Sequence, residues 1–191
     1  MKKALIGNGG HAREVMSQMG SKLKTFVDQN YLDGESSPLS EFNPSEYEVM
    51  VTISDPKIRQ KIVSSLPLCT KFFSFIHPTA LILDNNVEIG KGSFIGAYSI
   101  LTTNIRLGSH SILNRGNQIG HDSILGSFLS MMPGSIISGN VTLGDCVYLG
   151  TNSSIKEKMM INSNIYIGSN ATVIDNLKIS GTYVGVPARL K

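Results

Sequence analysis

A repeat of six residues runs over residues 89–184 without an insertion, and it constrains this chain more than any other feature. Counted from Ile89, the first residue of each of sixteen successive hexads is aliphatic. These first-position residues are Ile89, Ile95, Leu101, Leu107, Leu113, Ile119, Leu125, Met131, Ile137, Leu143, Leu149, Ile155, Ile161, Ile167, Val173 and Ile179. Because only 41% of the chain is hydrophobic, the odds of such a run by chance are on the order of one in a million.

Neither regular element explains a period of six, since helices repeat every 3.6 residues and strands every two. The second position of the hexad is Gly or Asn in most repeats: Gly90, Gly96, Gly108, Asn114, Gly120, Gly126, Gly144, Gly150, Asn162 and Gly168. Both residue types tolerate the backbone conformations of tight corners. We therefore expect short extended runs that alternate with corners, which is typical of a hexapeptide parallel β-helix. At three hexads a turn, the helix would form a prism roughly 25 Å tall.

The first 76 residues have a different pattern. Apolar segments at residues 4–6, 25–27, 49–53 and 72–76 predict four strands, and helices are expected after the first and the third. The second helix should begin at Ser54, Asp55 and Pro56, where a capping side chain precedes a proline at the first helical position. Strands that alternate with helices favour a small parallel α/β sheet. We therefore predict two domains, an α/β nucleotide-binding domain over residues 1–76 and an all-β domain over residues 77–191.

A glycine-rich turn follows the first predicted strand. Gly7, Gly9 and Ala12 fit the pattern G-x-G-x-x-G/A, whose glycines let backbone N–H groups and a helix N-terminus approach phosphate oxygens. Asp28 ends the second strand, and with Ser54 it is placed to meet a ribose or a base. There is room for only one mononucleotide half, so a nucleotide with a group on its diphosphate fits better than NAD. The same glycines are equally compatible with a tight turn that binds nothing.

The composition indicates the cellular location of the protein and the partners that it is not expected to have. No run of about 18 apolar residues predicts a membrane span, and the opening MKKALIGNGG breaks too early for a secretory signal. Cys69 and Cys146 have no ligand spacing, which favours a reduced, cytoplasmic location. The net charge is only +3 and the basic residues are scattered, so we expect no nucleic-acid partner.

Several motifs together resemble one family, the NeuD/PglD-like bacterial sugar acetyltransferases. The motifs are GNGGH at residues 7–11, VD at 27–28, IGHDSILG at 119–126 and GVPAR at 185–189. The resemblance covers essentially the whole chain. It implies a Rossmann-like N-terminal domain, a left-handed parallel β-helix and a homotrimer with active sites between neighbouring prisms. It also implies acetyl-CoA along the β-helix and a nucleotide-linked sugar at the glycine turn.

His121 is the predicted general base. It occupies the third position of its hexad, where a side chain projects from a corner, and histidine can accept a proton from an amine or a hydroxyl near neutral pH. Asp122 beside it is placed to orient the ring and to stabilise the imidazolium. The resemblance implies the same two roles. A surface histidine on a turn is the alternative reading.

Gly139 is expected one turn above His121, because it lies eighteen residues further along the chain. Its N–H is placed to donate to the thioester oxygen as charge develops there, a role that the resemblance also implies. A glycine needed only for the corner is equally compatible with the sequence.

The resemblance assigns further residues to the ligands. Gly10 and His11 belong to the nucleotide-side turn, and the tail residues Pro187, Ala188 and Arg189 are expected near coenzyme A. Lys156 and Lys158 lie two residues apart in the prism, where they either attract the phosphates of coenzyme A or form a solvated corner.

His77 and His110 are expected to be structural. Ser130 departs from the family, whose members often carry a second histidine at that position, in contact with the acyl donor or the substrate.

The leading hypothesis is acetyl-CoA-dependent, metal-free N-acetylation of a nucleotide-linked 4-amino-4,6-dideoxy sugar for surface-polysaccharide assembly. An O-acetyltransferase of sialic acid or a related sugar would use the same residues. A non-catalytic, nucleotide-sensing scaffold is a more remote alternative. The zinc-dependent carbonic-anhydrase type of β-helix needs three histidines on one metal, whereas only His110 and His121 lie within the repeat.

Overall fold

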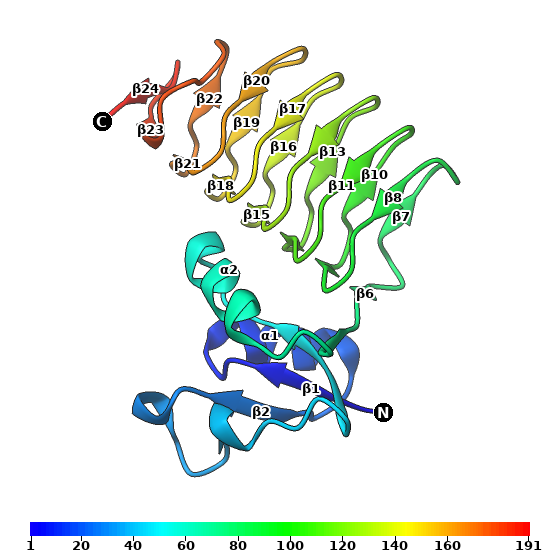
Figure 1. The fold of residues 1–191 in the computed structure, drawn as a ribbon. Coiled ribbons are helices and arrows are strands. Elements are labelled where there is room, and N and C mark those ends of the chain that lie inside the picture. The colour runs from blue at the N-terminus through cyan, green and yellow to red at the C-terminus, as the bar shows by residue number, and fades with distance from the viewer.

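The computed structural model describes residues 1–191 and consists of an α/β domain packed against one face of a triangular β-prism (Figure 1). The α/β domain has a parallel five-stranded sheet in the order β3-β2-β1-β4-β5. Its strands are β1 (Lys2–Ile6), β2 (Lys24–Val27), β3 (Ser37–Pro38), β4 (Tyr47–Val51) and β5 (Lys71–Phe72). Its helices are α1 (Gly10–Met19), α2 (Pro56–Ser65) and the short 3-10 turns η1 (Gln29–Tyr31) and η2 (Leu39–Glu41). Neither α-helix is long or apolar enough to span a membrane.

The first three predicted strands and both predicted helices are confirmed. Asp55 caps α2 as expected, since its Oδ1 accepts a hydrogen bond from the Ile58 N–H at 2.9 Å. The single strand predicted at residues 72–76 is wrong. The chain leaves the N-terminal sheet after Phe72 and buries Phe73, and β6 (Phe75–Ile76) then pairs with β9 in the prism. The prism therefore begins two residues before the predicted boundary at residue 77.

The prism has three sheets, whose strands are stacked in parallel. The six-stranded sheet contains β7 (Leu81–Ile82), β10 (Ile100–Leu101), β13 (Gln118–Ile119), β16 (Ile136–Ile137), β19 (Ser154–Ile155) and β22 (Thr172–Val173). The five-stranded sheet contains β8 (Glu88–Ile89), β11 (Arg106–Leu107), β14 (Ile124–Leu125), β17 (Thr142–Leu143) and β20 (Met160–Ile161). The eight-stranded sheet contains β6, β9 (Phe94–Ile95), β12 (Ile112–Leu113), β15 (Ser130–Met131), β18 (Tyr148–Leu149), β21 (Ile165–Ile167), β23 (Gly181–Val184) and the antiparallel β24 (Arg189–Leu190).

The hexad register is confirmed through most of the prism. Every first-position residue from Ile95 to Val173 is buried, and these residues form the main hydrophobic core. The prediction for Ile179 is wrong, because this side chain is 64% exposed. Leu177 takes its place in the core and bridges Ile161 sixteen residues back, instead of the usual eighteen. The Asn176 side chain accepts a hydrogen bond from the Met160 N–H at 2.7 Å, which closes this shortened coil. The repeat therefore ends after Val173.

The second-position glycines have a different role from the one predicted. The left-handed backbone conformation occurs at the fourth position of the hexad, for example at Asn104, His110 and Asp122. The second-position glycines have no positive φ. They are needed because adjacent coils approach each other closely: a Cβ on Gly120 would lie 2.6 Å from the backbone N of Gly139.

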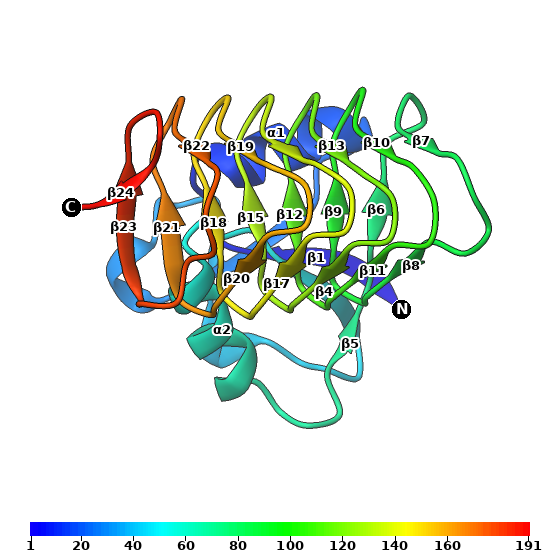
Figure 2. The same ribbon diagram turned by 90° about the horizontal axis from the view of Figure 1, so that it is seen from above.

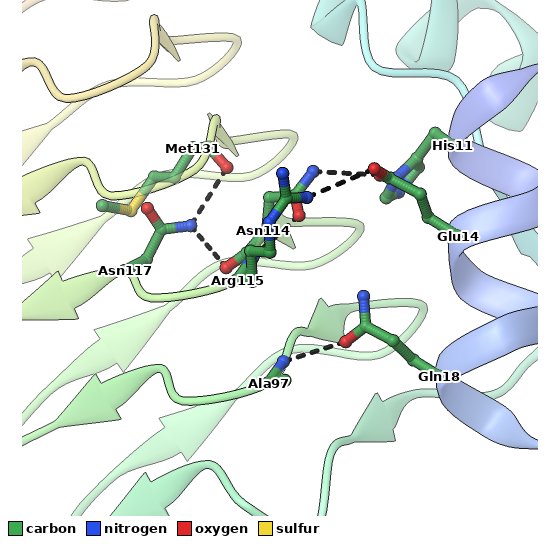
Figure 3. Close-up of polar contacts among 8 residues, drawn as sticks. All are labelled: His11, Glu14, Gln18, Ala97, Asn114, Arg115, Asn117 and Met131. Carbon is green, nitrogen blue, oxygen red and sulfur yellow. Dashed lines mark hydrogen bonds and ion pairs between the residues drawn. The ribbon is translucent and has the colours of Figure 1, made fainter.

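The N-terminal domain covers the eight-stranded sheet. Phe94 and Ile112 point outward from this sheet into the hydrophobic core that contains Leu5 and Met50. Helix α1 runs along one corner of the prism, where Gln18 accepts a hydrogen bond from the Ala97 N–H at 2.9 Å (Figure 3). Nearer the N-terminus of the same helix, the Glu14 carboxylate accepts a hydrogen bond from the Asn114 side chain at 3.2 Å and forms an ion pair with Arg115 at 3.3 Å (Figure 3).

Arg59 holds α2 to the opposite corner of the same sheet. Its guanidinium is fully buried and donates to the main-chain oxygens of Ile53 at 2.5 Å, His110 at 2.8 Å and Phe128 at 2.8 Å. It also donates to the Ser130 hydroxyl at 2.9 Å. Burial lowers the pKa of Arg59 to about 10, so the side chain stays charged and satisfies oxygens of both domains at once.

Candidate active site

His121 and Asp122 lie at the corner between the six-stranded and five-stranded sheets, where β13 turns into β14. The His121 Nδ1 atom is 2.7 Å from Asp122 Oδ2, and the two side chains are 56% and 45% exposed. Asn104 occupies the equivalent place one coil below and donates from Nδ2 to Asp122 Oδ1 at 2.7 Å. The hydrogen bonds from Asn104 and then His121 lower the pKa of Asp122. The corner thus presents a hydrogen-bonded chain of amide, carboxylate and imidazole.

This arrangement leaves the second imidazole nitrogen available. When Nδ1 carries the proton that is donated to Asp122, Nε2 has a free lone pair that can accept another proton. Nε2 lies directly over Gly139, since a Cβ on that residue would be 2.6 Å from it. Only glycine therefore leaves room for the ring in this position.

Gly139 also has an unused hydrogen-bond donor. The residue is buried, and its carbonyl accepts from the Lys158 N–H at 3.0 Å, but its own N–H has no hydrogen-bond partner in the chain. Buried N–H groups are rarely left unpaired. The Gly139 N–H is free to donate to an oxygen of a bound molecule close to His121.

The corner that carries His121 continues along the prism, and we call it the His121 edge. Its third-position residues, one from each coil, are Thr103, His121, Gly139, Glu157 and Asp175. Coils are spaced roughly 4.8 Å apart. Lys156 and Lys158 flank Glu157, and both are exposed. Arg189 in the tail pairs with Asp175 at 3.2 Å. The basic residues predicted to bind coenzyme A therefore share the His121 edge.

The tail folds back onto the last coils of the prism. The Ala188 N–H donates to the Thr172 carbonyl at 2.8 Å, and the Ala188 side chain is buried. Pro187 beside it is exposed, which leaves its ring on the surface near the end of the same edge.

The predicted nucleotide-binding residues form a second group at the carboxyl ends of the N-terminal strands. Gly7 has a φ of 113°, and a Cβ there would lie 2.9 Å from Ile53. Gly9 precedes α1 and offers no side-chain cap. The N–H groups of Gly10 and of the next two residues have no partner in the chain. This turn therefore presents unpaired N–H groups at a helix N-terminus, where anions are favoured.

The sheet order places Asp28 and Ser54 at the same edge. Asp28 follows β2 and Ser54 follows β4, on opposite sides of β1. The chain runs from β1 to β2 and β3 on one side of the sheet, and then crosses back to β4 on the other side of β1. The gap between β1 and β4 is therefore the topological switch point, where open α/β sheets bind ligands.

The His11 side chain lies elsewhere. Nδ1 of the ring is 3.6 Å from the Glu14 carboxylate (Figure 3). The ring packs edge-on against Phe94 at 5.4 Å, and Nε2 has no hydrogen-bond partner. Burial lowers the pKa of His11. The side chain is thus part of the domain interface, and only the backbone N–H of His11 belongs to the glycine turn.

Ser130 does not lie near His121. It is the sixth residue of its hexad, so its side chain points out of the eight-stranded sheet into the domain interface. It is fully buried and donates to the Ser54 carbonyl at 2.7 Å. This position therefore lies beside Ser54 at the carboxyl edge of the N-terminal sheet, away from the corner that carries His121.

His121 and the glycine turn lie on opposite sides of one chain. The N-terminal domain covers the eight-stranded sheet, and the His121 edge is the corner between the other two sheets. His110 occupies a third location, buried at the interface between Phe72 and Phe128, which confirms its structural role. The two prism histidines thus lie at different corners, and no three His, Cys, Asp or Glu side chains lie close enough together to hold a metal ion.

Two residues that matter here were not predicted from the sequence. Asn104 has a signal, because it precedes Asp122 by the eighteen residues of one coil. Arg59 has none, since nothing in its helical segment shows that it inserts into another domain.

Comparisons with known proteins agree with this architecture. Residues 2–66 match the PglD N-terminal domain family. The structure of WeeI from Acinetobacter baumannii AYE is 25% identical, with both chains covered completely and a TM-score of 0.88. PerB from Caulobacter crescentus, in complex with CoA and GDP-perosamine, is 24% identical, with 100% of this chain and 97% of PerB covered and a TM-score of 0.87.

The acetyltransferase domain of PglB from Neisseria gonorrhoeae FA1090, in complex with acetyl coenzyme A, is 24% identical, with 100% and 98% of the two chains covered and a TM-score of 0.85. No curated protein matches the sequence. The full-length fold matches confirm the predicted pairing of a Rossmann-like domain with a left-handed β-helix. Residues 2–66 therefore form a PglD N-terminal domain, and the whole chain shares the fold of WeeI, PerB and the acetyltransferase domain of PglB.

Proposed function

We propose that the protein transfers the acetyl group of acetyl-CoA to the 4-amino group of a nucleotide-linked 4-amino-4,6-dideoxy sugar. The observation that carries this proposal is the His121–Asp122 pair, with Nε2 unpaired above the free N–H of Gly139. The ligands of the similar structures support the same substrates, since PerB is in complex with CoA and GDP-perosamine and the PglB domain with acetyl coenzyme A.

The chemistry follows from three groups on the His121 edge. The sugar amine attacks the thioester carbonyl carbon, and the new C–N bond forms while His121 Nε2 accepts the amine proton. The C–S bond then breaks, and the CoA thiolate leaves and takes up a proton. Asp122 stabilises the imidazolium, and the Gly139 N–H donates to the carbonyl oxygen as negative charge develops there.

The two substrates reach this edge from different directions. Acetyl-CoA lies along the His121 edge, where the positive charges of Lys156, Lys158 and Arg189 attract its phosphates. The diphosphate of the sugar nucleotide sits on the N–H groups at Gly9 and Gly10, with its nucleoside toward Asp28.

A second copy of the chain completes the site. The glycine turn and His121 lie on opposite sides of one chain, so the sugar held by one chain reaches the histidine of another. The two uncovered sheets expose aliphatic side chains, including Leu81, Ile124 and Met160, which suits burial against neighbouring prisms. We propose a homotrimer, the closed symmetric assembly in which each of these sheets meets a neighbour.

The test is acetyl transfer from acetyl-CoA to a panel of UDP-, dTDP- and GDP-linked 4-amino sugars, with CMP-sialic acid and free sialic acid as hydroxyl acceptors. We expect an N-acetylated product from at least one amino sugar. The His121→Ala variant should lose roughly 10²- to 10⁴-fold in kcat/KM, whereas His77→Ala, at a partly exposed histidine outside this corner, should not. Full activity in His121→Ala would overturn the mechanism, and turnover of the hydroxyl acceptors alone would identify an O-acetyltransferase.

A further inference from the structure

Two tyrosines project from the eight-stranded sheet beyond Ser130. Ser130, Tyr148 and Tyr166 are register partners on the adjacent strands β15, β18 and β21. The two tyrosine rings are stacked, with their centroids 5.2 Å apart and an interplanar angle of 17°. Both rings are partly exposed, so the stack forms an aromatic surface on the prism next to the N-terminal domain.

Hydrogen bonds place this surface beside the end of β4. Ser130 donates to the Ser54 carbonyl at 2.7 Å, and the Tyr166 hydroxyl donates to Asp55 Oδ2 at 2.7 Å. Tyr148 lies between these two contacts in the strand register. Ser54 and Asp55 follow β4 at the carboxyl edge of the N-terminal sheet. Both ribbon views show α2 on the side of the N-terminal domain that lies near β18 and β21 (Figures 1 and 2).

Tyr166 is held firmly, but Tyr148 has a free hydroxyl. Burial alone would raise the pKa of Asp55, but the hydrogen bonds from Tyr166 and the Ile58 N–H lower it, so Asp55 is ionised and anchors Tyr166. The Tyr148 hydroxyl has no partner in the chain and is not sealed from solvent. The Lys57 Nζ lies 6.0 Å from the Tyr166 ring centroid and adds a positive charge at the same edge.

The direction of a bound nucleotide decides which part of it meets these tyrosines. In a mononucleotide fold the nucleoside lies toward the second strand, and the diphosphate lies at the first helix N-terminus, beside the switch point. Here the second strand ends at Asp28, and β4 lies on the other side of β1. A group attached to the diphosphate therefore extends toward Ser54, Asp55 and the tyrosine stack.

We infer that Tyr148 binds the sugar end of the nucleotide-linked substrate, and that Tyr166 and Asp55 position Tyr148 for this role. The C–H face of a deoxy sugar packs on the phenol ring, and the free hydroxyl bonds to a sugar hydroxyl or to the distal phosphate. The substrate site thus includes the prism of the same chain that supplies the glycine turn. This inference rests on the proposed function and deepens it by assigning recognition of the sugar to the prism.

The test compares equilibrium binding of bare UDP, dTDP and GDP with binding of the corresponding 4-amino-4,6-dideoxy sugar nucleotides, measured by calorimetry. Tyr148→Ala should bind the preferred sugar nucleotide roughly tenfold more weakly and leave binding of the bare nucleotide unchanged. Tyr148→Phe, which keeps the ring stack, should lose about threefold. Tyr98→Ala is the matched control at an exposed tyrosine on another part of the prism and should bind both ligands as the wild type does.

Two outcomes overturn the inference while leaving the proposed function intact. Unchanged binding of the sugar nucleotide in both Tyr148 variants removes the contact altogether. An equal loss of affinity for the bare nucleotide and for the sugar nucleotide means that Tyr148 contacts the nucleotide and not the sugar. If the wild-type protein binds neither ligand, the proposed function itself fails, and that result is distinct from both.

Discussion

Asn104 fixes how the Asp122 carboxylate meets His121, although it lies outside the sequence motif that contains these two residues. Its amide occupies one carboxylate oxygen of Asp122, which leaves the other oxygen for the imidazole. The stack arises because each coil adds eighteen residues, so that fourth-position side chains of successive coils come together. Orientation of the base is therefore supplied by the coil below it.

Replacing Asn104 should impair catalysis without unfolding the protein. We expect Asn104→Ala to lower kcat/KM for the amino sugar by about three- to tenfold, since one hydrogen bond to a carboxylate is lost. The melting temperature should stay within the range of surface substitutions. Asn170→Ala is the matched control, at a fourth-position asparagine with the same left-handed conformation on a different corner. Equal losses in the two variants would argue against a role for Asn104.

His110 should make stability depend on pH. Burial, followed by the charges of Lys91 and Arg59, lowers the pKa of His110 from 6.5 to about 4. Between these values the unfolded chain binds the proton and the folded chain does not, so stability is lost as the pH falls from about 6.5 towards 4. Urea titrations across this range should show a shallower decline in His110→Gln than in the wild type. His77→Gln, at a partly exposed histidine, should keep the wild-type slope; an unchanged slope in His110→Gln would contradict this account.

At the residue scale, the site could be predicted where the repeat alone determines position. His121 and Gly139 lie together because they are one coil apart, and the sequence period predicts that contact. The environments of Ser130 and His11 could not be predicted in the same way. They depend on which sheet the N-terminal domain covers, and the hexad pattern does not distinguish the three sheets from one another.

At the element scale, α2 carries the strongest link between the domains. The Arg59 guanidinium donates to the main-chain oxygens of Phe128 and Leu129, which directly precede β15. It also donates to the main-chain oxygens of Ile53 and Ser54 at the carboxyl edge of the N-terminal sheet. Helix α1 contributes more exposed contacts through Glu14 and Gln18. The position of this edge of the N-terminal sheet on the prism therefore depends chiefly on the buried side chain of Arg59.

Arg59→Met should loosen this attachment. The substitution keeps an unbranched side chain but leaves several buried carbonyl oxygens without a donor, which should lower the free energy of unfolding by about 2 kcal/mol. The measurement is urea unfolding followed by far-ultraviolet circular dichroism. Arg106→Met, at an exposed arginine on the five-stranded sheet, is the control and should be near neutral. Equal stability of Arg59→Met and the wild type would show that the domain contact does not depend on this residue.

The errors in element prediction have local physical causes. Leu177 and Ile179 are both aliphatic and lie two residues apart, so a count in sixes selects Ile179 although the shortened coil buries Leu177. Residues 72–76 form one apolar run in sequence, but Phe72 pairs with β4 and Phe75 with β9. Hydrophobicity alone does not show where a chain changes sheets.

At the scale of the whole molecule, the predicted site residues separate into two groups. The repeat and the glycine motif could each be predicted with their local geometry, because both are short-range patterns. Their placement on opposite sides of one chain could not, since it follows from docking through Arg59, Glu14 and the outward-facing Phe94. This separation is the reason for proposing that each active site is built from two chains.

Complementation between two inactive variants tests this central claim most directly. His121→Ala removes the base. Gly9→Asp places a carboxylate at the phosphate turn, where a Cβ meets no atom within 4 Å, so the variant should fold but repel the diphosphate. The two variants are co-expressed with different tags, and the mixed oligomers are purified and assayed for acetyl transfer to the preferred amino sugar. Each mixed trimer should recover about a third of the wild-type rate, because one of its three interfaces pairs an intact turn with an intact histidine. Mixed oligomers that stay as inactive as either variant alone would contradict a site shared between chains.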